Sequence, residues 1–179
     1  LTDTRLRLRA EVLEGSWECL EDGRADLLIS SLNPDITLTG IKHQSLQEEV
    51  MLYVAHPDHP LHEEPEPLAD ETLRRYRAIA IADTARRKPA LTYRLLDKQP
   101  RLTVSTMGEK RDALLAGIGV GTMPLSWIEE DIKAGRLKVI GPEYRHQVQV
   151  VLAWRRDTMG KAKSWLVREI PKLFPCKGE

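Results

Sequence analysis

The stretch STMGEKRDALLAGIGVGTMP, Ser105–Pro124, decides the fold. Thr106 and Glu109 are spaced as in a capping box ahead of an apolar run, which predicts that a helix begins here. The helix should run to Ala116 and end at Gly117, because glycine readily adopts the left-handed conformation that closes a helix. The remainder, IGVGTMP, is apolar and glycine-rich and predicts a buried strand. A capped helix followed at once by a buried strand is typical of α/β proteins.

Similar patterns recur along the chain. Arg5–Val12 alternates strictly between apolar and charged residues, so we expect an edge strand with one wet face. With a short helix at Trp17–Asp22 and a buried strand at Ala25–Ser30 it forms a strand-helix-strand unit, which predicts parallel pairing. Further strands are expected at Glu48–His56, Arg77–Ala82, Arg101–Ser105, Arg136–Ile140 and Val148–Asp157. Further helices are expected at Asp70–Tyr76, from a Ser126-x-x-Glu129 capping box to Gly135, and at Lys161–Leu173. The order predicts parallel sheets covered by helices.

Composition excludes several functions. Lysine plus arginine and aspartate plus glutamate both number 27, so these residues do not form a nucleic-acid surface by themselves. No apolar run is long enough to span a membrane, and no secretory leader is visible. Cys19 and Cys176 do not make a disulfide framework, which favours a reducing, cytoplasmic compartment.

The sequence shows none of the familiar catalytic or cofactor motifs. No nucleophile elbow, phosphate loop or zinc signature is present, so we expect neither an enzyme nor a cofactor. His56, His59 and His62 have a spacing open to metal ligation, but prolines separate them on an acidic loop. We therefore expect no metal site there.

Four ordered segments resemble one family. They are LEDGRADLLI (Leu20–Ile29), EEVMLYVAHPDHPL (Glu48–Leu61), LLAGIGVGTMP (Leu114–Pro124) and AGRL (Ala134–Leu137). Together they resemble the effector-binding domain of LysR-type transcriptional regulators, and the resemblance runs from about Arg5 to Leu173. It implies a fold similar to the type 2 periplasmic binding proteins, with two Rossmann-like α/β lobes joined by crossover strands and a small-molecule effector in the cleft. It also implies a homodimer or homotetramer that contacts DNA only through a helix-turn-helix domain.

The resemblance sets the expected domain boundaries. Residues 1–46 and 156–179 should form the first lobe and residues 47–155 the second, with hinges near Ser45–Glu49 and Trp154–Thr158. In the family a strand and a helix precede the segment that matches Arg5–Val12. The first lobe is therefore expected to be incomplete here, and the helix-turn-helix domain to be absent. The alternative is an extracytoplasmic solute-binding protein of a transporter, which shares the fold.

Ligands of open α/β sheets bind beyond the carboxyl ends of the strands. This rule predicts effector-binding residues on four segments, namely Gly15, Ser16 and Trp17; Ser30 and Ser31; Asp83, Thr84 and Arg86; and Thr106 and Met107. Amides and hydroxyls there suit an anionic or amide-rich effector, and Trp17 could stack on a flat ring. Structural roles stay open: Ser16 and Thr106 as helix caps, Trp17 and Met107 as core residues, Ser30 and Ser31 as a strand end. EGSW (Glu14–Trp17) and ADTARR (Ala82–Arg87) are also similar to a branch that senses purine-catabolic compounds, which ranks such ligands first.

Overall fold

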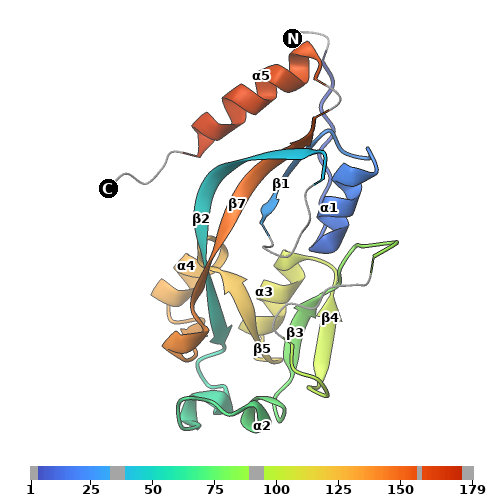
Figure 1. Cartoon of the computed structure of the whole chain (residues 1–179). Coiled ribbons are helices and arrows are strands. Elements are labelled where there is room, and N and C mark those ends of the chain that lie inside the picture. Colours follow the sequence, from blue (N-terminus) through green and yellow to red (C-terminus); the bar gives the residue numbers. More distant parts are fainter. Residues whose placement is uncertain (1–3, 33–38, 89–94, 157–158, 175–179) are drawn as a thin grey trace. The chain divides into compact units, whose positions relative to one another are not determined.

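The structure is a computed structural model, and it describes residues 4–32, 39–88, 95–156 and 159–174. These residues form two compact units, which we call unit 1 (residues 1–48, 83–90 and 148–179) and unit 2 (residues 49–82 and 91–147). Helices and strands are labelled in Figure 1. The helices are α1 (Glu14–Glu21), α2 (Asp70–Leu73), α3 (Met107–Leu115), α4 (Leu125–Lys133) and α5 (Lys161–Glu169). The strands are β1 (Leu27–Ser31), β2 (Ile41–Ala55), β3 (Ala78–Ile81), β4 (Arg101–Val104), β5 (Val120–Pro124), β6 (Lys138–Val139) and β7 (His146–Arg155). Short 3₁₀ turns lie at Pro60–Glu63, Pro142–Tyr144 and Ile170–Leu173.

Parallel pairing occurs in the middle of unit 2. There β3 pairs in parallel with β4 over its whole length and with β5 at Ala78, while β2 pairs antiparallel with β5 and β6. The α/β fold is confirmed, and the expectation of parallel sheets is met by β3, β4 and β5, whereas the pairs of β1 with β7 and of β2 with β5 and β6 are antiparallel. The strand GTM of β5 is fully buried, as its apolar sequence predicts.

Alternation along β2 divides the core of unit 2 into two clusters. Leu52 and Val54 pack with Ile79 and with residues of α3 and α4. Their neighbours Tyr53 and Ala55 point to the opposite face, where they pack with residues of α2 and of the loop between β2 and α2. Because both faces of the sheet are covered, its strands read as nearly continuous apolar runs.

Helices α3 and α4 are capped at their N-terminal ends in different ways: α3 by residues next to it in sequence, and α4 by a residue far away in sequence. The capping box of α3 is confirmed, since the Thr106 hydroxyl accepts from the Glu109 N–H at 3.1 Å and the Glu109 carboxylate accepts from the Thr106 N–H at 3.0 Å. The box predicted at Ser126 is wrong, because α4 begins at Leu125 without a side-chain cap of its own. Glu49 of β2 accepts from the Ser126 N–H at 3.2 Å instead.

A buried carboxylate joins the two long helices of unit 2. Asp131 of α4 accepts two hydrogen bonds from the Arg111 guanidinium of α3, at 2.6 and 2.8 Å, and one from Arg136 at 2.9 Å. Its side chain is almost inaccessible to solvent. The two guanidinium groups hold the pKa of Asp131 below its ordinary value, although burial alone would raise it. This pairing keeps α3 and α4 together above the sheet.

Unit 1 differs from the prediction in two respects. Its strand β1 pairs antiparallel with β7, so the predicted parallel strand-helix-strand unit does not form. Arg5–Val12 is not a strand: no described strand pairs with it, and Leu6 and Leu8 are 68% and 96% exposed. An alternating sequence becomes a strand only when a neighbour satisfies its backbone groups. The core of the unit is formed instead by Trp17, Leu20, Ile41, Val151 and Ala153.

The two compact units differ from the expected lobe boundaries. The first division lies after Glu48, within the predicted hinge Ser45–Glu49. A further boundary between the units lies between residues 147 and 148, within β7 and before the predicted hinge at Trp154–Thr158. Residues 83–90 group with unit 1 although the chain on both sides of them belongs to unit 2.

Candidate functional site

Residues 83–88, which we call the arm, dock on helix α1 and hold its first turn. The Asp83 carboxylate accepts from the Gly15 N–H at 2.9 Å and from the Glu14 N–H at 3.3 Å. Amides of a first helical turn have no partner within the helix, and a carboxylate also suits the positive end of the helix dipole. Asp83 therefore caps α1 from a distant part of the chain. The helix has no side-chain cap of its own, because its N-cap residue is Leu13.

The backbone of α1 approaches the arm too closely for any side chain at Gly15. A Cβ atom there would lie 2.1 Å from the Thr84 Oγ1 and 2.4 Å from the Thr84 carbonyl carbon. Thr84 in turn accepts from the Val12 N–H at 2.9 Å, and its hydroxyl lies 3.3 Å from the Val12 carbonyl oxygen. Three of the predicted effector residues thus have partners within the protein: Gly15 and Asp83 pair with each other, and Thr84 pairs with the backbone of Val12.

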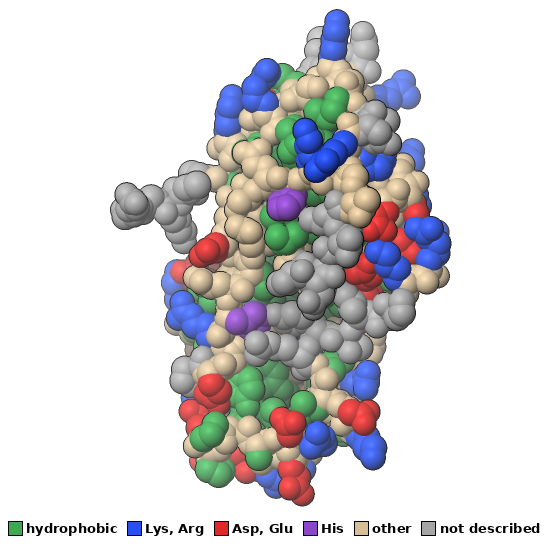
Figure 2. Space-filling view, in the orientation of Figure 1, with side chains coloured by type: hydrophobic (Ala, Val, Ile, Leu, Met, Phe, Trp, Pro, Cys, Tyr) green, Lys and Arg blue, Asp and Glu red, His purple; other side chains and the backbone are tan. Residues whose placement is uncertain are grey.

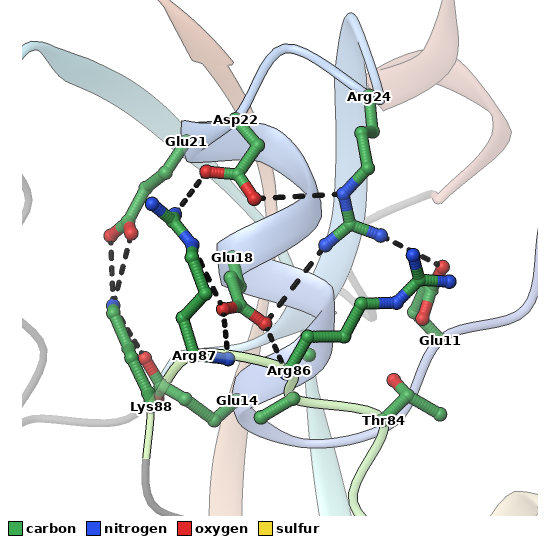
Figure 3. Close-up of polar contacts among 12 residues, drawn as sticks. Glu11, Glu14, Glu18, Glu21, Asp22, Arg24, Thr84, Arg86, Arg87 and Lys88 are labelled. Atoms are coloured by element: carbon green, nitrogen blue, oxygen red, sulfur yellow. Dashed lines mark hydrogen bonds and ion pairs between the residues drawn. The ribbon is translucent and has the colours of Figure 1, made fainter.

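A buried carboxylate in the middle of α1 anchors the rest of the arm. Glu18 is fully buried and accepts from the backbone N–H groups of Arg86 at 2.6 Å and Arg87 at 2.7 Å (Figure 3). The side chain of Arg87 donates to the same carboxylate at 3.2 Å. The Arg86 amide, followed by the Arg87 donors, holds the pKa of Glu18 below its ordinary value of 4.5 against the opposite effect of burial.

Charged side chains enclose this anchor on both sides, as Figure 3 shows. Lys88 donates to Glu14 at 2.6 Å and to Glu21 at 3.1 Å, and Arg87 also pairs with Asp22. On the other side Arg24 faces the carboxylates of Glu11, Glu18 and Asp22 at 3.7, 4.0 and 3.6 Å. These distances are too long for direct hydrogen bonds, and two buried nitrogens of Arg24 find no hydrogen-bond partner among the described residues.

Two predicted effector residues keep free polar groups. Ser16 is the third helical residue of α1 rather than its cap; it is buried, with 3% of its surface exposed, and in the described chain no group is hydrogen-bonded to its hydroxyl. The Arg86 guanidinium is exposed and likewise unpaired within residues 4–32, 39–88, 95–156 and 159–174, although its backbone is held by Glu18. Trp17, by contrast, is 2% exposed and packs in the core of unit 1, so stacking on a ligand would require it to leave that core.

The remaining predicted residues lie elsewhere in the two units. Ser30 and Ser31 belong to β1 of unit 1, opposite Val151 and Val150 of β7. Thr106 and Met107 belong to unit 2, where Thr106 caps α3 and Met107 packs against the core. Within unit 1 the structure pairs Gly15 with Asp83, packs Thr84 against Gly15 and holds the Arg86 backbone on Glu18.

Sequence reasoning missed the buried charges. Glu18 and Asp131 are among them, and so is Lys110 of α3, which is 9% exposed. Burial lowers the pKa of Lys110 from 10.5 to about 8, and no described residue forms a hydrogen bond or an ion pair with its ammonium. The burial of Lys110 could have been predicted from the sequence, because Lys110 stands at helical spacing with Met107 and Leu114, whose side chains face the core.

The three histidines of the proline-rich loop have local roles. The His59 ring accepts from the Leu61 N–H at 3.2 Å and so caps a 3₁₀ turn, and the His62 ring lies 3.2 Å from the carbonyl oxygen of His56. Burial lowers the pKa of both His59 and His62. Over the described residues, no group of three or more histidines, cysteines or carboxylates is placed to hold a metal ion.

Two solved structures share this architecture. The apo regulatory domain of HypT from Salmonella typhimurium superposes with a TM-score of 0.63 over 90% of this chain and 78% of that domain, at 17% identity. ArgP from Mycobacterium tuberculosis superposes with a TM-score of 0.66 over 96% of this chain and 57% of that protein, also at 17% identity. At these identities the likeness concerns the fold, which is the α/β fold of LysR-type regulatory domains and periplasmic binding proteins.

Sequence comparison identifies the family. Residues 2–174 match the LysR substrate binding domain. The chain is 55% identical over 178 residues to the HTH-type transcriptional regulator YhaJ of Escherichia coli O157:H7, covering 98% of this chain and 59% of YhaJ. It is 31% identical to the uncharacterized HTH-type transcriptional regulator YeeY of Escherichia coli K12, covering 93% of this chain and 54% of YeeY. The chain belongs to the LysR substrate-binding domain family, and it spans little more than half the length of these relatives.

Proposed function

We propose that this chain is the effector-sensing domain of a LysR-type transcriptional regulator. It binds a small metabolite and so controls DNA binding and transcription through a helix-turn-helix domain. Membership of the family supports this function, and the relatives named above are HTH-type transcriptional regulators rather than transporter components or enzymes. The solute-binding alternative has no such support.

The observation that carries a ligand site is the anchored arm. Asp83 and Glu18 fix the backbone of the arm on α1, yet the Ser16 hydroxyl and the Arg86 guanidinium remain unpaired among the described residues. Polar groups that are held in place but not used internally are the groups a ligand can take up without first breaking a contact. We assign Ser16 and Arg86 to direct effector contact, and Gly15, Asp83 and Thr84 to positioning them.

The other predicted residues complete this proposal. Ser30, Ser31, Thr106 and Met107 would contribute further polar and apolar contacts to the effector. The effector shifts the conformation of the domain only by the difference between its affinities for the two states. The predicted hinge at Ser45–Glu49, where the two units divide, is the segment that would absorb the change.

A metabolite screen tests the function. Purine-pathway compounds, aromatic acids and short organic acids are screened for an increase in the unfolding temperature, and each hit is titrated by calorimetry. Ser16→Ala and Arg86→Ala should weaken binding, the second most for anionic ligands, because a guanidinium pairs with carboxylates. Ser164→Ala and Arg101→Ala, at exposed positions, are the matched controls. Unchanged affinity in the first two variants would show that the effector binds elsewhere.

We also propose the partners that the resemblance implied. The full-length protein is a homodimer or homotetramer in the cytoplasm, and the exposed Leu6 and Leu8 offer apolar surface that a partner could cover. No described helix is both long and apolar enough to pass through a bilayer. Acidic and basic side chains stand next to each other at several places on the face shown in Figure 2, and the overall charge is balanced. The isolated chain should therefore not bind duplex DNA specifically in a gel-shift assay.

A further inference from the structure

The proline-rich loop of unit 2 contains a short turn that is capped by a histidine ring. The turn is Pro60–Glu63, and its N-cap residue is His59. Pro60 has no backbone N–H, so the first amide of the turn that needs a partner is that of Leu61. The His59 Nδ1 accepts from this amide at 3.2 Å. An imidazole can act as such a cap only while its Nδ1 carries no proton.

The capped turn keeps a core side chain in place. Leu61 is 1% exposed and packs in the second core cluster of unit 2, with Tyr53 of β2 and Leu73 of α2. Within the turn, the His62 N–H donates to the His59 carbonyl at 3.1 Å. A single turn has little stability of its own, because it fixes several dihedral angles for few hydrogen bonds. Its conformation therefore depends on the cap and on the burial of Leu61.

The element that packs against the His59 ring offers it no free carboxylate. The Tyr76 ring meets the His59 ring edge to face, with the ring centroids 5.2 Å apart. The Tyr76 hydroxyl donates to Glu64 at 2.8 Å, and Arg75, whose guanidinium lies 6.0 Å from the centroid of the Tyr76 ring, donates to Glu64 at 3.2 Å. Glu64 is thus committed to other groups. Among the described residues, His59 forms no ion pair.

The two neighbouring histidines oppose a positive charge on His59. The His62 Nε2 lies 3.2 Å from the His56 carbonyl oxygen, so both residues belong to the same folded loop as His59. Burial, followed by the charges that His62 and His56 can carry, lowers the pKa of His59. Other charged groups act on these two neighbours, and they are Asp58 at His56, and Lys138 and Glu63 at His62.

We propose that His59 is a pH-sensitive cap: when its ring takes up a proton, the Pro60–Glu63 turn opens and Leu61 loses its fixed place in the core of unit 2. A proton on Nδ1 sets one N–H against another, so the Leu61 amide loses its acceptor. The open turn exposes the ring to water, where a histidine has a pKa of about 6.5. Because the closed turn lowers the pKa of His59, the turn is fully stable above pH 6.5 and opens progressively as the pH falls below that value.

This device goes beyond the proposed function and uses none of the residues assigned to effector contact. It would make unit 2 respond to acidification in a pH range in which carboxylates of ordinary pKa are already ionised. The proposed function stands or falls with the metabolite screen, whereas the histidine cap is tested on the protein without any ligand.

Hydrogen exchange at the Leu61 amide tests the proposal. Its exchange rate is measured by NMR between pH 7.5 and pH 5.5 and compared with that of an unprotected amide at the same pH, which gives a protection factor. In wild type this factor should fall by up to about tenfold over the series, because the open form gains up to tenfold for each pH unit below 6.5. His59→Asn should abolish the fall, since asparagine also caps but does not titrate. His43→Asn, at an exposed histidine of β2, is the matched control and should behave as wild type does.

Ring ¹⁵N spectra of wild type supply a readout that does not depend on a variant. At pH 7.5 the His59 Nδ1 should be the unprotonated nitrogen of a neutral ring, and the ring should titrate below pH 6.5. A protonated Nδ1 at pH 7.5, a titration of His59 at or above pH 6.5, or a Leu61 protection factor that does not change with pH would each overturn the inference. A His59→Asn protein that keeps the wild-type pH dependence would also overturn it, because another group would then be the one that titrates.

Discussion

Replacing Lys110 with methionine should make the domain more stable at neutral pH. Methionine is close to lysine in length and shape, so it should fill the space against Gly121 without leaving a cavity. What changes is the charge. Burial lowers the pKa of Lys110 from 10.5 to about 8, which means that the folded protein holds this proton less tightly than the unfolded chain does.

The size and sign of the effect follow from linkage. Above pH 10.5 the lysine is neutral in both states, and burial of its amine costs no charge. Between pH 10.5 and pH 8 the unfolded chain binds a proton that the folded protein does not, so stability falls as the pH falls. Below pH 8 both states are protonated and the penalty is constant. At about 1.4 kcal/mol for each tenfold change in proton affinity, the full penalty is about 3 kcal/mol.

Urea unfolding at a series of pH values measures this penalty. The free energy of unfolding of Lys110→Met should exceed that of wild type by about 3 kcal/mol at pH 7, and the difference should shrink toward zero near pH 10.5. Lys138→Met, exposed on β6, is the control and should stay within about 0.5 kcal/mol of wild type throughout. The argument that the ammonium is buried without a partner would be refuted by either of two results. One is a Lys110→Met protein that is no more stable than wild type at pH 7, and the other is a gain in stability that is the same at pH 7 and at pH 10.5.

The docking of the arm on α1 leads to three further predictions. Gly15→Ala should destabilise by about 1–3 kcal/mol in urea unfolding, because its Cβ would overlap Thr84, whereas Gly108→Ala, at the same position of α3 but with open space, should be neutral or stabilising by up to about 1 kcal/mol. Asp83→Ala should cost about 1–2 kcal/mol by removing the cap of α1, and an unchanged urea midpoint would count against that cap. Glu18 has a lowered pKa, so its contribution to stability is present above pH 4.5 and is lost as the pH falls through the lowered value. Glu18→Gln should therefore be less stable at pH 7 and lose less stability between pH 7 and pH 3 than wild type, and parallel curves would argue against the anchor.

Local sequence patterns predicted the second unit well. The capping box at Thr106 and Glu109, the helix end at Gly117 and the buried strand that follows all depend on residues within a few positions of one another. The side chain that caps α3 and the amide that it caps are in the same short segment. Such a pattern can be read without knowing what else lies nearby.

The same reasoning failed where a distant residue took the expected partner's place. Ser126 has the spacing of a cap, but Glu49 occupies the amide at the start of α4. Ser16 could cap a helix, but α1 begins earlier and Asp83 supplies its carboxylate. Arg5–Val12 alternates as a strand does, yet no described strand pairs with it.

The sequence by itself therefore determined the α/β class, the two ends of α3 and the family, because these depend on apolar periodicity, on short-range hydrogen bonds and on the order of segments. The tertiary structure alone decided which polar groups are used up and which are free. It joined Asp83 to Gly15, fixed the arm on Glu18, and left Ser16, Arg86 and Lys110 without partners among the described residues. Hydrogen bonds between residues some 70 positions apart leave no local pattern in a sequence. Burial of a single charge depends on every element that packs around it.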